Sequence, residues 1–189
     1  MNSLGSRKWM MGCIAMAMAL IILSGNSIAL YKQVDALEKE VVGHITSEWY
    51  QLYRLSEMVD KYYIRNNYED PRRYQLFVNQ TAHHFEGRAD DLSVHMRNLL
   101  VLAYDPLFAD LSLENGPSNK EEASTLLRAM NDDIMMISRG IVDMQDHEKE
   151  KLLDPASSEY MKVSTQVKDA SEKYIQLVDD YFKNNSREQ

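Results

Sequence analysis

The sequence predicts an all-α protein in which an N-terminal transmembrane helix precedes an up-down-up-down four-helix bundle. An apolar run without charged residues occupies 9–31. Beyond it, apolar residues recur every three or four positions in four segments, at about 31–66, 71–103, 119–152 and 155–183. No stretch shows the sustained alternation of apolar and polar residues that is typical of a half-buried strand. Four such helices joined by short connections pack most simply as a bundle.

The apolar run at 9–31 is long enough, at about 1.5 Å per helical residue, to cross about 30 Å of hydrocarbon. Arg7 and Lys8 precede it, and acidic residues begin only at Asp35. The positive-inside rule therefore places the N-terminus in the cytoplasm and the rest of the chain outside. A cleaved signal peptide ending at Ala29 is the alternative, but helical periodicity resumes at once and favours an uncleaved anchor.

These segments divide the chain into four regions. We expect a cytoplasmic tail at 1–8, the transmembrane anchor at 9–31, a periplasmic bundle at 32–183 and a C-terminal tail at 184–189. A single span with a cytoplasmic N-terminus follows from this order, and the family resemblance described below implies that the membrane is the bacterial inner membrane.

Helix starts are marked by three Asp-Pro pairs, at 70–71, 105–106 and 154–155. Aspartate is a preferred N-cap residue, and proline in the first helical position loses no hydrogen bond. A turn cluster at 114–119 precedes another start, capped by Ser118 or Asn119, and a short helix is expected at about 106–111. The fourth segment carries the most regular seam, with alternating steps of four and three typical of a coiled coil: Ala156, Tyr160, Val163, Val167, Ala170, Tyr174, Leu177 and Tyr181. An up-down-up-down order returns the C-terminus to the end of the bundle nearest the membrane.

Composition argues against several functions. The net charge of −8 argues against nucleic acid as a partner, because the phosphate backbone needs a basic face. The sequence contains no glycine-rich phosphate loop, no H-E-x-x-H and no nucleophile elbow, and its single cysteine, Cys13, lies in the apolar run. We therefore expect no catalytic residues, no enzyme activity and no cofactor.

Histidines offer a weak metal hypothesis. Three of the five have an acidic residue one helical turn away, as His44 has Glu48, but these pairs lie on different helices. Because further ligands are missing, solvated surface pairs are the favoured interpretation and no metal site is predicted. A periplasmic metal-binding protein remains a third alternative.

Polar residues interrupt the apolar seams of the first two helices. If these helices are antiparallel neighbours, positions in the 50s face positions in the 80s, so Glu57 and Arg88 could form an internal ion pair. The other interpretation is a pocket for a small polar ligand between the helices. The candidate ligand-binding residues are Trp49, Tyr53, Glu57, His84 and Arg88. The ion pair is the favoured interpretation because it needs no additional partner.

Three stretches carry a resemblance to a known family. The helix after the apolar run begins Ile28-Ala-Leu-Tyr-Lys-Gln-Val-Asp-Ala-Leu-Glu-Lys-Glu40 and continues in Trp49-Tyr-Gln-Leu-Tyr-Arg-Leu-Ser-Glu57; Phe85-Glu-Gly-Arg88 then precedes Asp91-Leu92. Over about 28–100 these stretches resemble the extracytoplasmic input regions of bacterial transmembrane receptors, chiefly hybrid histidine kinases and diguanylate cyclases.

The resemblance implies a periplasmic sensor domain for signal transduction, of the kind found in two-component systems. Such a domain binds a small molecule or a partner protein and forms a dimer beside the membrane. Receptors of this kind continue into a second span and an output domain, whereas this sequence ends at Lys183-Asn-Asn-Ser-Arg-Glu-Gln189. We therefore expect either the input part of a longer receptor, or a single-span envelope scaffold or adaptor that acts only through protein contacts with a homodimer partner or another envelope protein.

Overall fold

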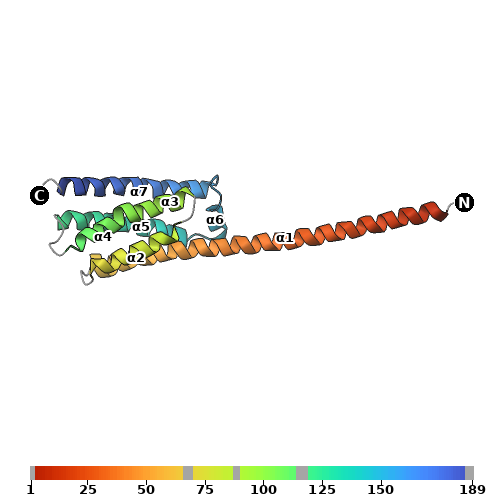
Figure 1. The fold of residues 1–189 in the computed structure, drawn as a ribbon, viewed down its shortest axis with the longest axis horizontal. Coiled ribbons are helices and arrows are strands. Elements are labelled where there is room, and N and C mark those ends of the chain that lie inside the picture. The colour runs from red at the N-terminus through yellow and green to blue at the C-terminus, as the bar shows by residue number, and fades with distance from the viewer. Residues whose placement is uncertain (1–2, 66–69, 87–89, 114–118, 186–189) are drawn as a thin grey trace. The chain divides into compact units, whose positions relative to one another are not determined.

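The computed structural model confirms the all-α class: the residues that it describes form helices and no strand. The described residues are 3–65, 70–86, 90–113 and 119–185, and of the first 29 residues only Met16 and Ser27 have described side chains. The chain divides into two compact units, Met1–Gly43 and His44–Gln189. We call the second unit the bundle (Figure 1).

The first helix, α1, spans Ser3–Met58 and continues into a π-helical segment, η1, at Val59–Ile64. Within the first unit the side chains from 30 to 41 are all exposed. Across the part of the chain that is described, no helix is both long and apolar enough to cross a membrane. The predicted anchor at 9–31 falls mostly on residues whose side chains lie outside the description, so it stays a prediction.

The prediction of a single helix over 71–103 is wrong, because one helix ends and another begins within this range. Helix α2 spans Pro71–His84 and is capped at its start by Asp70, as predicted, whose carboxylate accepts from the backbone N–H of Arg72 at 2.9 Å. Helix α3, Asp91–Leu99, begins anew after Asp90, whose carboxylate accepts from Ser93 N–H at 2.9 Å. An aspartate that caps a new helix competes with continuation of the old one.

After α3 the helix continues through a second π-helical segment, η2, at Leu100–Tyr104, into α4 at Asp105–Leu111. The short helix expected near 106–111 is therefore present. However, Asp105 does not cap it, because the chain is already helical at Tyr104. The Asp105 carboxylate instead accepts from the side-chain amide of Asn79 in α2 at 2.8 Å.

The structure also differs from the prediction for the last two helices. Helix α5 spans Lys120–Val142 and is capped by Asn119, as predicted, but a break separates it from α6, Asp146–Lys151. Helix α7 spans Ser158–Asn185. The Asp154-Pro155 pair stabilises the turn before α7 rather than its start, since Asp154 accepts from Ala156 N–H at 3.0 Å.

Hydrogen bonds between helices show the order of the bundle. Arg72 donates to the Ser112 carbonyl and Asn79 to Asp105, so α2 and α4 run antiparallel. Helix α5 also runs antiparallel to α7, while the stretch from α3 to α4 runs parallel to α7. The parallel order follows from bonds that join Leu92 to Tyr160 near one end and Asp110 to Tyr181 near the other.

The break between α2 and α3 therefore adds one pass to the bundle, and the expected four-helix order is wrong. Because Tyr181 is bonded to Asp110 at the end of α4, the C-terminal end of α7 lies where α2 begins (Figure 1). The expected return of the C-terminus to the end at which the bundle starts is wrong for the same reason.

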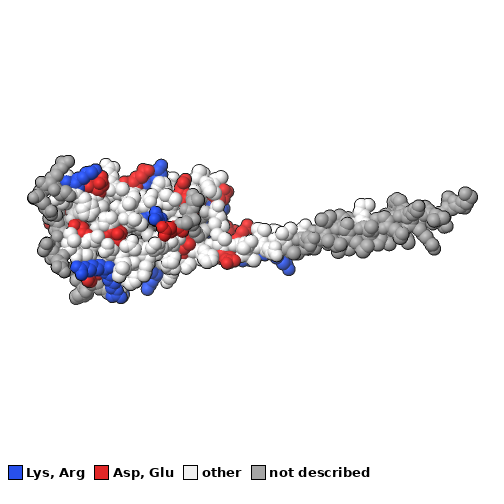
Figure 2. Space-filling model, viewed as in Figure 1, with Lys and Arg blue, Asp and Glu red and all other residues white. Residues whose placement is uncertain are grey.

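The core of the bundle is mostly apolar and aromatic. Phe108 is in ring contact with Tyr63, Tyr74 and Tyr104, at centroid distances of 5.7, 5.6 and 5.2 Å. One buried polar chain crosses it: Tyr104 O–H donates to Asn131 Oδ1 at 2.5 Å, and Asn131 Nδ2 donates to the Ser56 carbonyl at 3.2 Å. On the face of the bundle shown in Figure 2, acidic and basic side chains are interspersed.

Candidate functional site

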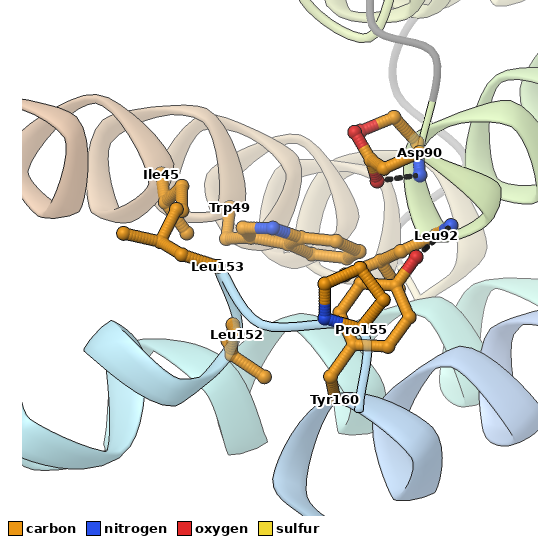
Figure 3. Close-up of a pocket in the computed structure, with 9 residues that line it drawn as sticks. Ile45, Trp49, Asp90, Leu92, Leu152, Leu153, Pro155 and Tyr160 are labelled. Carbon is orange, nitrogen blue, oxygen red and sulfur yellow. Dashed lines mark hydrogen bonds between the residues drawn. The ribbon is translucent and has the colours of Figure 1, made fainter. Parts of the chain in front are cut away.

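A cavity of about 110 Å³ lies inside the bundle, between segments that are distant in the sequence (Figure 3). We call it the Trp49 cavity. Its walls come from α1, from the N-terminus of α3, from the connection between α6 and α7, and from the first turn of α7. The lining residues are Ile45, Trp49, Asp90, Leu92, Ser93, Leu152, Leu153, Pro155 and Tyr160.

The α1 wall consists of Ile45 and Trp49, which lie one helical turn apart and therefore on one face of the helix. Trp49 is only 2% exposed. Its indole meets the ring of Phe85, the C-cap residue that follows α2, edge to face at a centroid distance of 5.2 Å. An edge-to-face contact of this kind is a favoured arrangement of two aromatic rings, and it packs the Trp49 indole against Phe85.

The α3 wall supplies the charge. Asp90 caps α3 with one carboxylate oxygen, which accepts from Ser93 N–H. A carboxylate has about four lone-pair sites, so this cap leaves acceptor capacity for another group. Asp90 is half-buried at the cavity, where a negative charge is less screened than at a fully exposed position.

The third wall is the connection between α6 and α7, which is held in place at both ends. Ser157 Oγ donates to the Lys151 carbonyl at 2.6 Å, and Lys151 Nζ donates to Glu159 Oε1 at 2.5 Å. The hydrogen bond from Lys151 lowers the pKa of Glu159 to about 2. These two bonds connect the end of α6 to the first turn of α7, on either side of the stretch that carries Leu152, Leu153 and Pro155.

Tyr160 closes the cavity from α7. Its hydroxyl oxygen accepts from Leu92 N–H at 3.4 Å, a long bond that links the start of α7 to the start of α3 (Figure 3). A tyrosine hydroxyl that accepts one bond can still donate its own proton. The cavity thus combines two aromatic side chains, one carboxylate and an otherwise mainly aliphatic wall.

This arrangement suits a small ligand with an apolar body and a cationic group. For scale, an engineered apolar cavity of about 150 Å³ binds benzene. Aromatic faces attract ammonium groups, and a carboxylate beside them pairs with the same charge. The lining residues of the Trp49 cavity include no histidine and no cysteine.

The structure does not bring the five predicted ligand-binding residues together in this cavity. Trp49 lines it, while Tyr53 lies half-buried on α1 outside its walls. Glu57 accepts a hydrogen bond at 2.5 Å from Arg54 on its own helix. Arg88 lies outside the described residues, so its predicted pairing with Glu57 stays a prediction.

His84 lines a second, shallower hollow between α1 and α2. Its volume is about 310 Å³, and Tyr50, Arg54 and Gln80 are among its other lining residues. The hollow is lined both by α1 residues between 50 and 58 and by α2 residues between 77 and 84, so positions in the 50s lie opposite positions near 80, as predicted. Most of its polar residues are exposed, which makes it a weaker candidate than the Trp49 cavity.

The sequence analysis missed Asp90 and Tyr160 as site residues. A signal for Asp90 was present, since Gly87 and then Asp90-Asp91 favour a helix end followed by a new cap. Tyr160 gave no such signal, because its position on the α7 seam is that of an ordinary core residue.

Among the residues described, no group of three or more histidine, cysteine or acidic side chains could hold a metal ion. In comparisons with known proteins, no protein-family model, no curated protein and no solved structure matched the chain.

Proposed function

We propose that this chain is a membrane-anchored periplasmic sensory input domain that binds a small organic cation in the Trp49 cavity. The observation that carries the proposal is the cavity itself, because three segments far apart in the sequence place Trp49, Asp90 and Tyr160 around one small space. Such convergence of aromatic and charged groups on an apolar cavity is typical of ligand sites in helical proteins.

Charge supports a cationic ligand. The chain has 29 acidic and 21 basic residues, and an acidic protein raises the local concentration of cations. The Trp49 cavity has one carboxylate and no basic side chain among its lining residues. An anionic ligand would meet the Asp90 carboxylate without a compensating positive side chain.

The anchoring part of the proposal depends on the apolar run at 9–31 and on the basic residues that precede it. The sensory part depends on the position of the cavity between α1 and the start of α7. A ligand that binds better to one arrangement of these helices shifts the population toward it. A second span or a partner protein would carry the signal across the membrane.

A thermal-shift screen of the full chain in detergent micelles tests this function. Small primary and quaternary amines are compared with neutral and carboxylate compounds of matched size. Ligands that bind only the folded protein stabilise it and so raise its melting temperature. At a ligand concentration of one hundred times the Kd, the added stability is about 2.7 kcal/mol. The expected result is a shift with amines that is larger than the shift with either matched set.

A matched pair of variants makes the test specific. Asp90→Asn keeps an N-cap residue but removes the charge, and Asp70→Asn makes the same change at the cap of α2, outside the cavity. The amine shift is expected to vanish in Asp90→Asn and to persist in Asp70→Asn. The proposal fails if no amine shifts the melting temperature, or if both variants respond like the parent protein.

A second candidate function, the envelope adaptor, is favoured by a different observation. An open groove of about 600 Å³ runs along α7, with Leu102, Ile175 and Phe182 among its lining residues. Leu102 is 51% exposed, so the groove offers apolar surface to a partner helix. The two functions can be compared in a strain from which the gene for this protein is deleted. If the Leu102→Lys variant fails to restore the lost phenotype while the Asp90→Asn variant restores it fully, the adaptor function is favoured over the sensor function.

A further inference from the structure

An exposed apolar stripe runs along α1 within the first unit. Leu30, Val34, Leu37 and Val41 are 61, 50, 59 and 38% exposed. Their spacing is four, three and four residues, which places them on one face of the helix. Scattered exposed apolar residues are ordinary, but a continuous stripe at heptad spacing marks a surface for another helix.

The residue types along the stripe select a particular partner. In the heptad that fits this spacing, Val34 and Val41 occupy the a positions, and Leu30 and Leu37 occupy the d positions. A β-branched residue at a with leucine at d favours parallel, two-stranded coiled coils. Charged residues lie off the stripe: Asp35 and Lys39 form an ion pair at 2.9 Å, with exposed side chains.

We propose that residues 30–41 of two copies of this chain form a parallel, two-stranded coiled coil. The flanking residues are compatible with this pairing. Gln33 occupies a g position and Glu38 the following e position, so in a parallel pair the amide of one copy lies beside the carboxylate of the other. Like charges at this contact would oppose association, and none meet here.

The helix needed for the coiled coil already exists. An isolated helix shorter than about 12–15 residues is marginal in water, so this stretch would not fold alone. Here it lies inside α1, which spans Ser3–Met58. Association of two copies therefore does not have to offset the free-energy cost of forming the helix. Because only two heptads are described as exposed, the dimer is expected to be reversible and to depend on concentration.

Cysteine cross-linking of the full chain in detergent micelles tests the interface. Cys13 is first replaced by serine, which leaves no other cysteine. Single cysteines are then placed on the stripe, at Leu30, Val34, Leu37 and Val41, or on the opposite face, at Lys32 and Lys39. A disulfide forms readily only where Cα atoms approach within about 7 Å. We expect all four stripe positions to cross-link at least about tenfold faster than the two outward positions.

Each other outcome overturns the proposal. Equal rates at all six positions would show random collision, and no dimeric product at the stripe would show that a copy of this chain does not cover it. Cross-linking at only one stripe position would indicate an antiparallel pair. In such a pair a residue lies opposite the same residue of the other copy only where the twofold axis passes between the helices. Leu37→Glu provides a second measurement: it should reduce the particle mass to that of a monomer while leaving the melting temperature of the bundle unchanged.

Discussion

The exposed stripe of α1 and the seam of α7 share one apolar spacing but differ in burial. Along α7, Val163, Val167 and Tyr174 are at most 3% exposed, because α3 and α5 pack against this helix. Along α1, Val34 and Leu37 are at least 50% exposed. A heptad-like pattern therefore identifies a surface that favours a neighbouring helix, and the structure shows whether the same chain supplies that neighbour.

The largest expected effect comes from placing a charge on each surface. Val167→Asp buries an unpaired carboxylate in the core and should lower the free energy of unfolding by more than about 4 kcal/mol. Leu37→Asp should change it by no more than about 0.5 kcal/mol, because the side chain is exposed. Urea unfolding followed by circular dichroism measures both. Equal losses of stability would contradict the difference in burial.

A second prediction concerns the buried polar chain that joins α1, η2 and α5. Asn131→Ala removes the partner of both the Tyr104 hydroxyl and the Ser56 carbonyl, so it should cost about 2–3 kcal/mol. Tyr104→Phe should cost about 1 kcal/mol. In a double-mutant cycle the two losses should not add, because the residues share a hydrogen bond. Strict additivity would show that the two groups do not interact.

High pH should weaken the packing of α7. Burial and the hydrogen bond that Tyr174 donates to Asp133 raise the pKa of Tyr174 to about 12, from an ordinary value of 10.0. Its contribution to stability is therefore complete below about pH 10 and is lost as the pH rises toward about 12. The urea midpoint, measured at intervals from pH 9 to 12, should fall in that window.

Tyr174→Phe serves as the control for the pH prediction, since it removes the titrating hydroxyl. Tyr181, bonded to Asp110, also has a raised pKa caused by burial, so the variant should flatten the fall without abolishing it. A variant profile identical to that of the parent protein would show that Tyr174 contributes nothing to the alkaline loss of stability.

The smallest effect distinguishes two neighbouring residues of α7. Leu177 belongs to the predicted seam but is 39% exposed, whereas Val178 is 2% exposed. Val178→Ala should cost about 2 kcal/mol and Leu177→Ala less than about 1 kcal/mol. Thermal unfolding measures both losses. A larger loss for Leu177→Ala than for Val178→Ala would support the seam predicted from the sequence, in which Leu177 is the core residue.

The seam illustrates how far the fold could be predicted from the sequence. The helical class and the caps at Asp70 and Asn119 depend on local residue patterns, and the structure confirms them. The shift from Leu177 to Val178 follows from geometry, because a straight helix has 3.6 residues per turn and drifts by about 20° per heptad from an exact seven-residue repeat.

The candidate site was harder to predict, because its members are brought together by tertiary packing. Trp49 stood out in the sequence, but its neighbours Asp90 and Tyr160 belong to α3 and α7. Their positions depend on the break between α2 and α3, which adds one pass and places the start of α3 beside the start of α7. The predicted four-pass order could not bring these residues together.

Tryptophan fluorescence tests the central claim, that the Trp49 cavity binds a small organic cation, most directly. The chain has two tryptophans, so Trp9→Phe leaves Trp49 as the sole reporter. Titration of this variant with the small amine that gives the largest thermal shift should produce a saturable change in emission. The change should persist with Asp70→Asn and disappear with Asp90→Asn. An emission that does not change, or that changes equally with Asp90→Asn, would contradict the claim.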